Sequence, residues 1–250
     1  MSNQATVSAY PTLTSKIRQR INDLPWRLAE FREQIFPEEF TRFREAVTPY
    51  TMLGYGRLRG LYRAVHHAVT NDIAGDIVEC GTARGGSAAL MGLTLRQLGS
   101  DRSLWVFDTF AGLPPPTEKD PDYDIARHFT GTCRGELDEV KSLFKRLGIF
   151  DRVCFVEGLF QETLPTSSIS SIAVLHVDGD WYESVRSCLE ALYDRVSFGG
   201  VIQIDDYGHW AGARKAVEEF FKERSIQPSL KYLDYTGRQF VKPASSRNPL

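Results

Sequence analysis

From residue 76 onward, short apolar runs alternate with longer segments whose apolar residues recur every three or four positions. The runs are 76–80, 104–108, 153–157, 172–178 and 200–205, and the clearest amphipathic segments are 87–98, 183–196 and 213–224. Short runs that are apolar throughout are typical of parallel strands covered on both faces, and the spacing between them is that of helices. The alternation therefore predicts an α/β fold with a doubly wound parallel sheet.

The end of the chain departs from this alternation. Residues 230–234 and 238–242 are strand-like and are separated by Tyr235, Thr236 and Gly237, as in a β-hairpin. Five parallel strands finished by an antiparallel hairpin give a seven-stranded, mostly parallel sheet. A dinucleotide-binding fold would usually continue with further helical crossovers instead.

Two segments lie outside the alternating pattern. Before residue 70 the apolar residues follow helical spacing, as at Ile17, Ile21, Leu24 and Leu28, and this predicts an N-terminal helical cap (1–70) on a core domain (71–250). The triple proline that starts at Pro114 opens a charged, glycine-containing insertion of residues 114–136. An insertion of that length after a strand end predicts a lid over a ligand site, with a disordered surface loop as an equal alternative.

Acidic residues close two of the predicted strands. Asp178 ends the run 172–178, and Asp205 and Asp206 end the run 200–205. Parallel neighbouring strands lie about 4.8 Å apart, so these carboxylates would meet at one edge of the sheet. Such a cluster needs a counter-charge, and a hard divalent cation such as Mg²⁺ is the natural one. Asp205 and Asp206 can serve one ion only if the strand has ended there, because successive strand residues point to opposite faces.

Asp180 belongs to the same sequence cluster but has another predicted role. Asp180 and Glu183 have the D-x-x-E spacing of a helix capping box. This spacing assigns Asp180 to the start of the following helix and leaves Asp178 as the acid of this strand that faces the site.

The first strand leads into a glycine turn. Gly81 allows a tight turn, and Gly85 and Gly86 allow a ligand to approach the backbone at a helix start. A plain strand-to-helix turn has the same glycines. Asp108 closes the second strand, where an acid commonly binds a ribose diol, although a solvated or capping aspartate is the alternative. Gly158 with Phe160 would accommodate an adenine ring, or they are ordinary loop and core residues.

Histidines accompany the acids. His176 lies inside the strand that ends at Asp178, and a lone strand histidine is more often a hydrogen-bonded core residue than a ligand. His209 and Trp210 follow Asp206 in a loop, where they would either line a substrate pocket or simply pack.

Composition limits the partners. A net charge of −2 and an isoelectric point near 6.2 give no basic footprint for nucleic acid or an anionic membrane. No apolar run approaches the roughly 18 residues of a membrane span, and the first residues do not have the pattern of a signal peptide. The four cysteines (Cys80, Cys133, Cys154 and Cys188) are far apart, which favours reduced thiols in a cytoplasmic protein.

Four segments together resemble a known family. They are Val78–Ser87, the stretch FDTFAGLP at 107–114, HVDGDWYES at 176–184 and IQIDDYGHW at 202–210. This combination resembles the macrocin O-methyltransferase family, which includes the mycinamicin and tylosin sugar methyltransferases and the novobiocin noviose methyltransferase. The resemblance covers roughly residues 50–242.

The resemblance implies a Rossmann-like class I methyltransferase that uses S-adenosylmethionine and Mg²⁺ to methylate a sugar hydroxyl of a natural product, as a homodimer or higher oligomer. The family's metal ligands map onto Asp178, Asp205 and Asp206, and its proposed general base maps onto Asp178. Its cofactor contacts map onto Thr51, Met52, Glu79, Gly81, Thr82, Ala83, Ser87, Asp108, Thr109, Gly158, Phe160 and Asp178. We assign the substrate side to Tyr123 and His128 in the lid and to His209.

Two other functions fit parts of the pattern. Asp178-Gly179-Asp180 is a D-x-D, as in metal-dependent glycosyltransferases, but the glycine turn and the second acid pair argue against this alternative. A non-catalytic module that binds an adenosyl ligand is the other alternative, and three acids at two strand ends are a costly feature for such a module.

Overall fold

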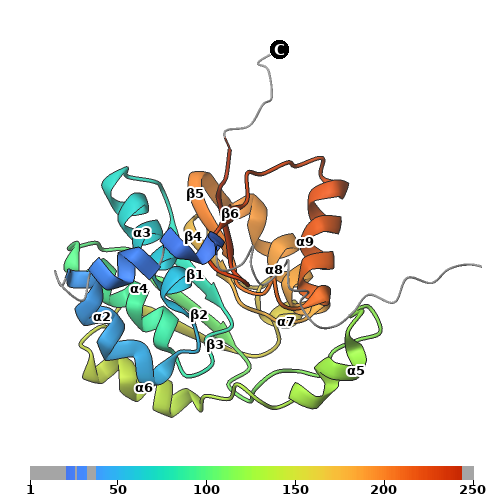
Figure 1. Ribbon diagram of the computed structural model, residues 1–250. Helices are drawn as coiled ribbons and strands as arrows, with labels where there is room; N and C mark the ends of the chain where they lie inside the picture. The colour runs from blue at the N-terminus through green and yellow to red at the C-terminus, as the bar shows by residue number, and fades with distance from the viewer. Residues whose placement is uncertain (1–20, 26, 33–37, 244–250) are drawn as a thin grey trace, which may run out of the picture.

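The computed structural model describes residues 21–25, 27–32 and 38–243, and it contains the predicted seven-stranded sheet (Figure 1). The strand order is β3-β2-β1-β4-β5-β7-β6. The strands are β1 (Asp76–Cys80), β2 (Leu104–Asp108), β3 (Val153–Glu157), β4 (Ile172–Val177), β5 (Val196–Ile204), β6 (Lys231–Tyr232) and β7 (Arg238–Val241). Strands β1 to β5 pair in parallel, and β7 pairs antiparallel with both β5 and β6. The predicted fold class is confirmed.

Helices cover both faces of the sheet. The elements are α2 (Glu39–Val47), η1 (Thr48–Tyr50), α3 (Tyr55–Thr70), α4 (Gly86–Gln97), α5 (Tyr123–Ala126), η2 (Arg127–Phe129), α6 (Leu137–Arg146), α7 (Phe160–Thr163), α8 (Tyr182–Leu192), η3 (Tyr193–Arg195) and α9 (Ala211–Glu223). Within the described ranges, no helix has both the length and the apolarity needed to cross a membrane.

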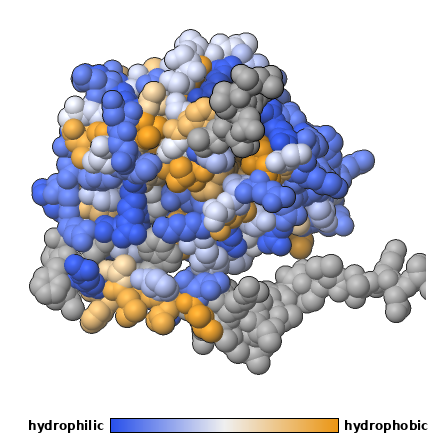
Figure 2. All heavy atoms as spheres, turned by 90° about the horizontal axis from the view of Figure 1, so that it is seen from above, coloured by the Kyte–Doolittle hydropathy of each residue, from blue (hydrophilic) through white to orange (hydrophobic). Residues whose placement is uncertain are grey.

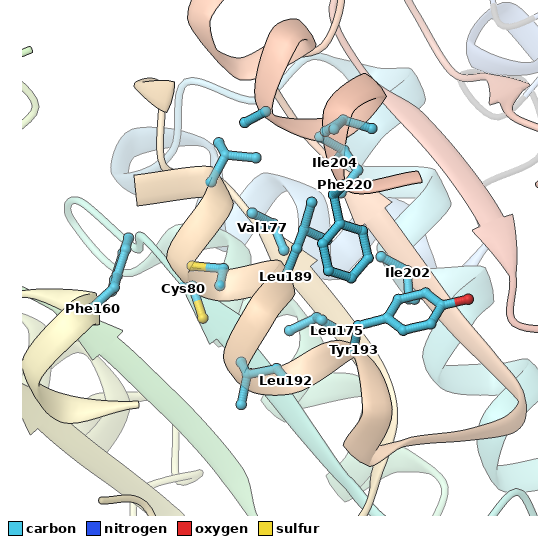
Figure 3. Close-up of a cluster of buried hydrophobic side chains, with 14 of the residues drawn as sticks. Cys80, Phe160, Leu175, Val177, Leu189, Leu192, Tyr193, Ile202, Ile204 and Phe220 are labelled. Atoms are coloured by element: carbon cyan, nitrogen blue, oxygen red, sulfur yellow. The ribbon is translucent and has the colours of Figure 1, made fainter. Parts of the chain in front are cut away.

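Strand β4 lies at the centre of two hydrophobic clusters. Leu175 and Val177 pack with α8 and α9, for example against Leu189 and Phe220 (Figure 3). Val174 faces the opposite cluster, which α3 and α4 cover. A strand buried on both faces is apolar throughout, and this explains why its sequence reads as one continuous run.

The segment before β5 differs from its prediction. The helix predicted to reach residue 196 is α8 to Leu192 and continues as η3 to Arg195, whereas β5 begins at Val196 rather than at Gly200. The buried ammonium of Lys242 stabilises this junction, because its Nζ donates to the carbonyls of Tyr193, Asp194 and Val196.

Part of the predicted cap is continuous with the core. Helix α3 packs beside α4, and its residues Leu58, Leu61 and Val65 belong to the same buried cluster as the sheet. Residues 21–25 and 27–32 are helical, as their spacing predicts, but Ile21 and Leu28 are more than 60% exposed. Ile17 lies outside the described residues.

The insertion at 114–136 is ordered and contains α5 and η2. Asp120 Oδ1 accepts a hydrogen bond from the backbone N–H of Tyr182 at 2.7 Å, and Asp122 Oδ2 accepts one from Ala211 N at 3.0 Å. These bonds attach the lid to the first residues of α8 and α9. The predicted capping box is wrong, since α8 starts at Tyr182 and is capped by Asp120 rather than by Asp180.

Candidate active site

Four aspartates gather at the carboxyl ends of β4 and β5. The strands end at Val177 and Ile204, so Asp178, Asp205 and Asp206 follow directly, and the two adjacent acids can face one site. Carboxylate oxygens of Asp178, Asp180 and Asp206 lie within 4.8 Å of one another, and ligand atoms of His176, Asp178 and Asp205 form a second such group. The structure therefore places Asp178 beside Asp205 in one group and beside Asp206 in the other, and it adds Asp180 to the second group.

Asp180 faces this cluster through an unusual backbone. Its φ is +56°, a left-handed conformation that a non-glycine residue rarely adopts and that costs of order 1–3 kcal/mol. Its Oδ1 accepts a hydrogen bond from the indole of Trp210 at 2.8 Å, and its N–H donates to Asp206 Oδ2 at 3.1 Å. The exclusion of Asp180 from the site on the ground of helix capping was wrong.

Asp205 is the acid whose negative charge is best balanced by positive neighbours. Burial opposes its ionisation, but the charges of Arg57 and His176 outweigh burial and hold the pKa of Asp205 below its ordinary value. Arg57 Nη1 bonds Asp205 Oδ2, while His176 Nε2 lies 3.5 Å from Oδ1. Asp205 is thus ionised and held at both oxygens.

The negative charges of the other three acids are not balanced in this way. Burial first, and neighbouring carboxylates second, raise the pKa values of Asp178, Asp180 and Asp206, and that of Asp206 to about 7. Buried carboxylates that repel one another are stabilised by a bound cation. An all-oxygen donor set is the one that Mg²⁺ and Ca²⁺ prefer, so the residues present fit a hard divalent cation.

A chain of alternating charges extends from the cluster in both directions. Glu79 Oε1 lies 2.8 Å from His176 Nδ1, and both side chains are fully buried. On the other side of Asp205, Arg57 Nε donates to Asp234 Oδ2 at 2.9 Å. The chain links β1, β4, β5, α3 and the turn between β6 and β7. Burial opposes protonation of His176, but its two acidic partners raise its pKa to about 9.

This chain of charges includes two residues that the sequence analysis discussed, His176 and Glu79. His176 is the hydrogen-bonded core histidine that was expected. Glu79, predicted as a cofactor contact, has its carboxylate directed to His176 and lines no part of the cavity described below. Arg57 was missed because no motif marks it. The available signal was an arginine four residues before Leu61, on the apolar face of α3, where a buried guanidinium needs an acidic partner.

A cavity of about 340 Å³ opens beside the acids. The predicted site residues that line it are Met52, Gly81, Ala83, Asp108, Thr109, Phe160, Asp178, Asp205, Asp206 and His209. A neighbouring hollow of about 280 Å³ is lined by Thr51, Thr82 and Ser87 and shares Met52, Ala83 and Asp178 with the first. Gly158, Tyr123 and His128 line neither of the two.

The glycine turn is held by Asp108. The backbone N–H groups of Thr82 and Ala83 donate to Asp108 Oδ2 at 2.7 and 3.0 Å, and Phe110 N donates to Oδ1 at 2.8 Å. An ionised carboxylate accepts about four hydrogen bonds, so capacity for a ligand hydroxyl remains. Thr82 Oγ1 is buried and has no hydrogen-bond partner, which marks this turn as a place for a polar ligand.

Gly81 allows this turn to approach the acid cluster. Its φ is +91°, and a Cβ at this position would lie 1.8 Å from the carbonyl oxygen of Asp178. Only glycine therefore lets the ends of β1 and β4 come this close.

Aromatic side chains form the other side of the cavity. Trp210 packs edge-on against Trp181 at 4.8 Å and against Phe129 of the lid at 5.3 Å, measured between ring centroids. His209 Nδ1 is hydrogen-bonded to the hydroxyl of Tyr235, which comes from the β6–β7 turn. Phe129 and Tyr235 were not predicted, because only the fold brings these two loops to the strand ends.

Fold and site together define a class of protein. A mostly parallel sheet with an antiparallel seventh strand, a glycine turn after β1 and a cavity at the carboxyl ends of the strands are the features of a Rossmann-like class I methyltransferase. The calicheamicin methyltransferase CalS11 shares this fold at a TM-score of 0.62 and 17% identity, over 96% of this chain and 98% of that one.

Closer relatives identify the family. The macrocin-O-methyltransferase (TylF) family matches residues 38–242. Demethyldecarbamoylnovobiocin O-methyltransferase of Streptomyces niveus is 36% identical over 75% of this chain and 74% of its own length. Mycinamicin III 3''-O-methyltransferase of Micromonospora griseorubida is 33% identical over 75% and 76%.

A solved structure agrees with these relatives. The O-methyltransferase NovP superposes with a TM-score of 0.73 at 34% identity, over 78% of this chain and 83% of that one. The chain belongs to the macrocin O-methyltransferase family, and it is accordingly an O-methyltransferase.

Proposed function

We propose that the protein transfers a methyl group from S-adenosylmethionine to a hydroxyl of a sugar on a small-molecule glycoside, in a reaction that depends on Mg²⁺. One observation carries the proposal. The carboxylates of Asp178, Asp180 and Asp206, the first two half-buried and the third buried, meet at the wall of a cavity whose other end is the glycine turn after β1. A metal-assisted acceptor site and a cofactor site thus adjoin in one cavity.

The cofactor end is formed by the turn after β1. The segment Gly81–Ala83 and Asp108 would hold the polar groups of S-adenosylmethionine, with Met52 and Phe160 on the apolar walls. Bound there, the cofactor supplies an electrophilic methyl group. Asp108 fixes the turn through three backbone bonds, and this preorganisation lowers the entropic cost of placing the two reactants in line.

The acceptor end is formed by the acids. Asp178, Asp205 and Asp206 would hold Mg²⁺, and the ion would supply Lewis-acid activation of the acceptor hydroxyl. Asp178 accepts the proton of the attacking hydroxyl, because its carboxylate lies at the cavity wall beside the other two proposed metal ligands. Arg57 and His176 keep Asp205 ionised and in place.

The sugar lies against the aromatic side. Trp210 and Phe129 present apolar surface to the ring of an acceptor, and His209 with Tyr235 present polar atoms. Relatives support a glycoside, because the enzyme of Streptomyces olivaceus, 35% identical over 80% of this chain and 78% of its own, is named for a 4'-O-methylation of a rhamnosyl tetracenomycin. This protein would act in antibiotic-type biosynthesis, in the cytoplasm, as a homodimer or higher oligomer.

Family membership favours methyl transfer over the glycosyltransferase and adenosyl-sensing alternatives. The D-x-D acids are also explained without a nucleotide diphosphate, since Asp178 and Asp180 both face Asp206.

The test compares wild type with Asp178→Asn. Calorimetry with S-adenosylmethionine should give similar affinities, while transfer of labelled methyl to a panel of glycosides should fall by at least about 100-fold. EDTA should abolish transfer by the wild type, and Mg²⁺ should restore it. Full activity in EDTA would remove the metal from the proposal, and unchanged turnover by Asp178→Asn would remove the base.

A further inference from the structure

Asp180 follows Asp178 by two residues and presents its carboxylate to the same acid cluster. It forms a group with Asp178 and Asp206 in which one oxygen of each side chain lies within 4.8 Å of the others. Oxygen ligands bind Mg²⁺ and Ca²⁺ at roughly 2.0–2.6 Å, so two ligands on opposite sides of one ion lie about 4–5 Å apart. The three carboxylates are therefore close enough to share one ion.

The acids of the cluster differ in the partners that their oxygens already have. Asp205 Oδ2 bonds Arg57, and Asp205 Oδ1 lies 3.5 Å from His176 Nε2, so both oxygens face a basic group. Among the described residues, the only hydrogen bond to the Asp180 carboxylate comes from the Trp210 indole, which donates to Oδ1 at 2.8 Å. The second oxygen of Asp180 is therefore available to a cation.

The backbone directs Asp180 toward the cluster rather than toward the helix that follows it. Its φ of +56° is left-handed, and its N–H donates to Asp206 Oδ2 at 3.1 Å. The cap of α8, which the sequence spacing offers to Asp180, is supplied by Asp120, whose Oδ1 accepts the N–H of Tyr182. A fold retains an unfavourable backbone conformation only where the surrounding contacts enforce it.

Trp210 determines the direction of the Asp180 carboxylate. Its ring is buried and packs against Trp181 at 4.8 Å and against Phe129 at 5.3 Å, measured between ring centroids. Because the ring is held by two neighbours, its N–H is fixed in the direction of Asp180 Oδ1. Hydrogen bonds of this kind orient metal ligands, and their loss typically weakens metal binding about 10–100-fold.

We propose that Asp180 is a ligand of the same divalent cation as Asp178 and Asp206, and that the indole of Trp210 positions it. The inference rests on the metal-dependent function proposed above and adds one ligand and one positioning residue to it. Trp210 also lines the cavity, so a single side chain faces the acceptor and supports the metal site.

The test measures binding of Mn²⁺, which takes the same oxygen ligands as Mg²⁺. Electron paramagnetic resonance of the free ion, titrated into the full chain without cofactor or acceptor, gives the dissociation constant. Asp180→Asn should raise this constant at least about tenfold, because the amide removes the charge but keeps an oxygen for Trp210 and tolerates the left-handed backbone. Trp210→Phe keeps an aromatic ring, removes the N–H and should raise the constant about tenfold.

Two further variants separate ligation from a structural role. Glu183→Gln changes a partly exposed acid near Asp180 that pairs with Lys119 at 2.8 Å, and it should leave the constant within about twofold of wild type. Asp180→Gly should lose at least as much Mn²⁺ affinity as Asp180→Asn. In EDTA, however, its melting temperature should not fall below that of wild type, because glycine adopts the left-handed conformation without strain. A purely structural Asp180 predicts the reverse, a lower melting temperature and an unchanged constant.

The outcomes distinguish this inference from the function on which it rests. If wild type binds no Mn²⁺, the metal-dependent function fails and the inference fails with it. If wild type binds Mn²⁺ and both Asp180 variants bind it within about twofold of wild type, Asp180 is not a ligand, while the proposed metal site itself stands. If the Asp180 variants lose affinity and Trp210→Phe does not, the indole has no positioning role. None of these results depends on methyl transfer.

Discussion

Replacing Asp206 by asparagine should stabilise the fold when divalent cations are absent. Burial and the nearby charge of Asp205 raise the pKa of Asp206 from 3.8 to about 7. One pKa unit corresponds to about 1.4 kcal/mol, so ionised Asp206 costs the folded state up to roughly 4 kcal/mol above neutral pH. Asparagine removes the charge and keeps an oxygen that can accept the N–H of Asp180.

The sign of the pH dependence follows from the same value. A carboxyl whose pKa is raised by folding binds a proton more tightly in the folded state, so wild-type stability should rise as pH falls from 8 to 6. His176, with a folded pKa of about 9, contributes in the same direction but is present in both proteins. The difference between wild type and Asp206→Asn therefore reports Asp206 and its effect on the neighbouring acids Asp178 and Asp180, and it should shrink toward pH 6.

Urea unfolding at pH 8 in EDTA and then in excess Mg²⁺ measures both effects. In EDTA the variant should be more stable than wild type by up to about 4 kcal/mol. In Mg²⁺ wild type should gain more, since saturation at 100 times the dissociation constant adds about 2.7 kcal/mol and the variant has lost a ligand. A variant that is less stable in EDTA, or one that responds equally to Mg²⁺, would refute the reasoning.

Three further substitutions test the supports of the site. Asp120→Ala should destabilise the fold by about 1–2 kcal/mol and expose the lid to proteolysis, because it removes the cap of α8; urea unfolding and limited trypsin digestion check this. Lys242→Met should cost roughly 1–3 kcal/mol in urea, since three carbonyls lose their donor, whereas Lys222→Met on exposed α9 surface should cost little. Gly81→Ala should cost more than either, of order 4 kcal/mol or loss of the fold, because its Cβ would overlap the Asp178 carbonyl; circular dichroism melting measures it.

The sheet could be predicted from the sequence because local patterns determine which residues form its strands. Continuous apolar runs identified the five parallel strands, and the acid that closes a run marked each strand end within one residue in β4 and β5. The meeting of Asp178 with Asp205 and Asp206 follows from strand order alone, since β4 and β5 are neighbours. For these features, local pattern and global fold agree.

The sequence failed where a contact depends on distant segments. Asp180 and Glu183 have the spacing of a capping box. The lid packs against the start of α8, however, so that Asp120 accepts the N–H of Tyr182 and Asp180 faces the site instead. Arg57 is 148 residues from its partner Asp205 in the sequence, so no local pattern could predict their contact. The exposure of Ile21 and Leu28 was not predicted either (Figure 2), because spacing shows that a helix has an apolar face but not which way the face turns.

The acids and the glycine turn are built in a different way from the loops that face the acceptor. The acids and the glycine turn follow strands that are buried on both faces, so any shift of these groups would disturb the core. The acceptor side comes from the lid, the loop before α9 and the β6–β7 turn, where Phe129 packs on Trp210 and His209 bonds Tyr235. Loops tolerate substitution and insertion far better than strands do. Acceptor preference can therefore change through these three loops while the metal and cofactor positions stay fixed. The charge chain from Glu79 to Asp234 connects the acids to these loops, because Arg57 bonds both Asp205 of the proposed metal site and Asp234 beside the β6–β7 turn.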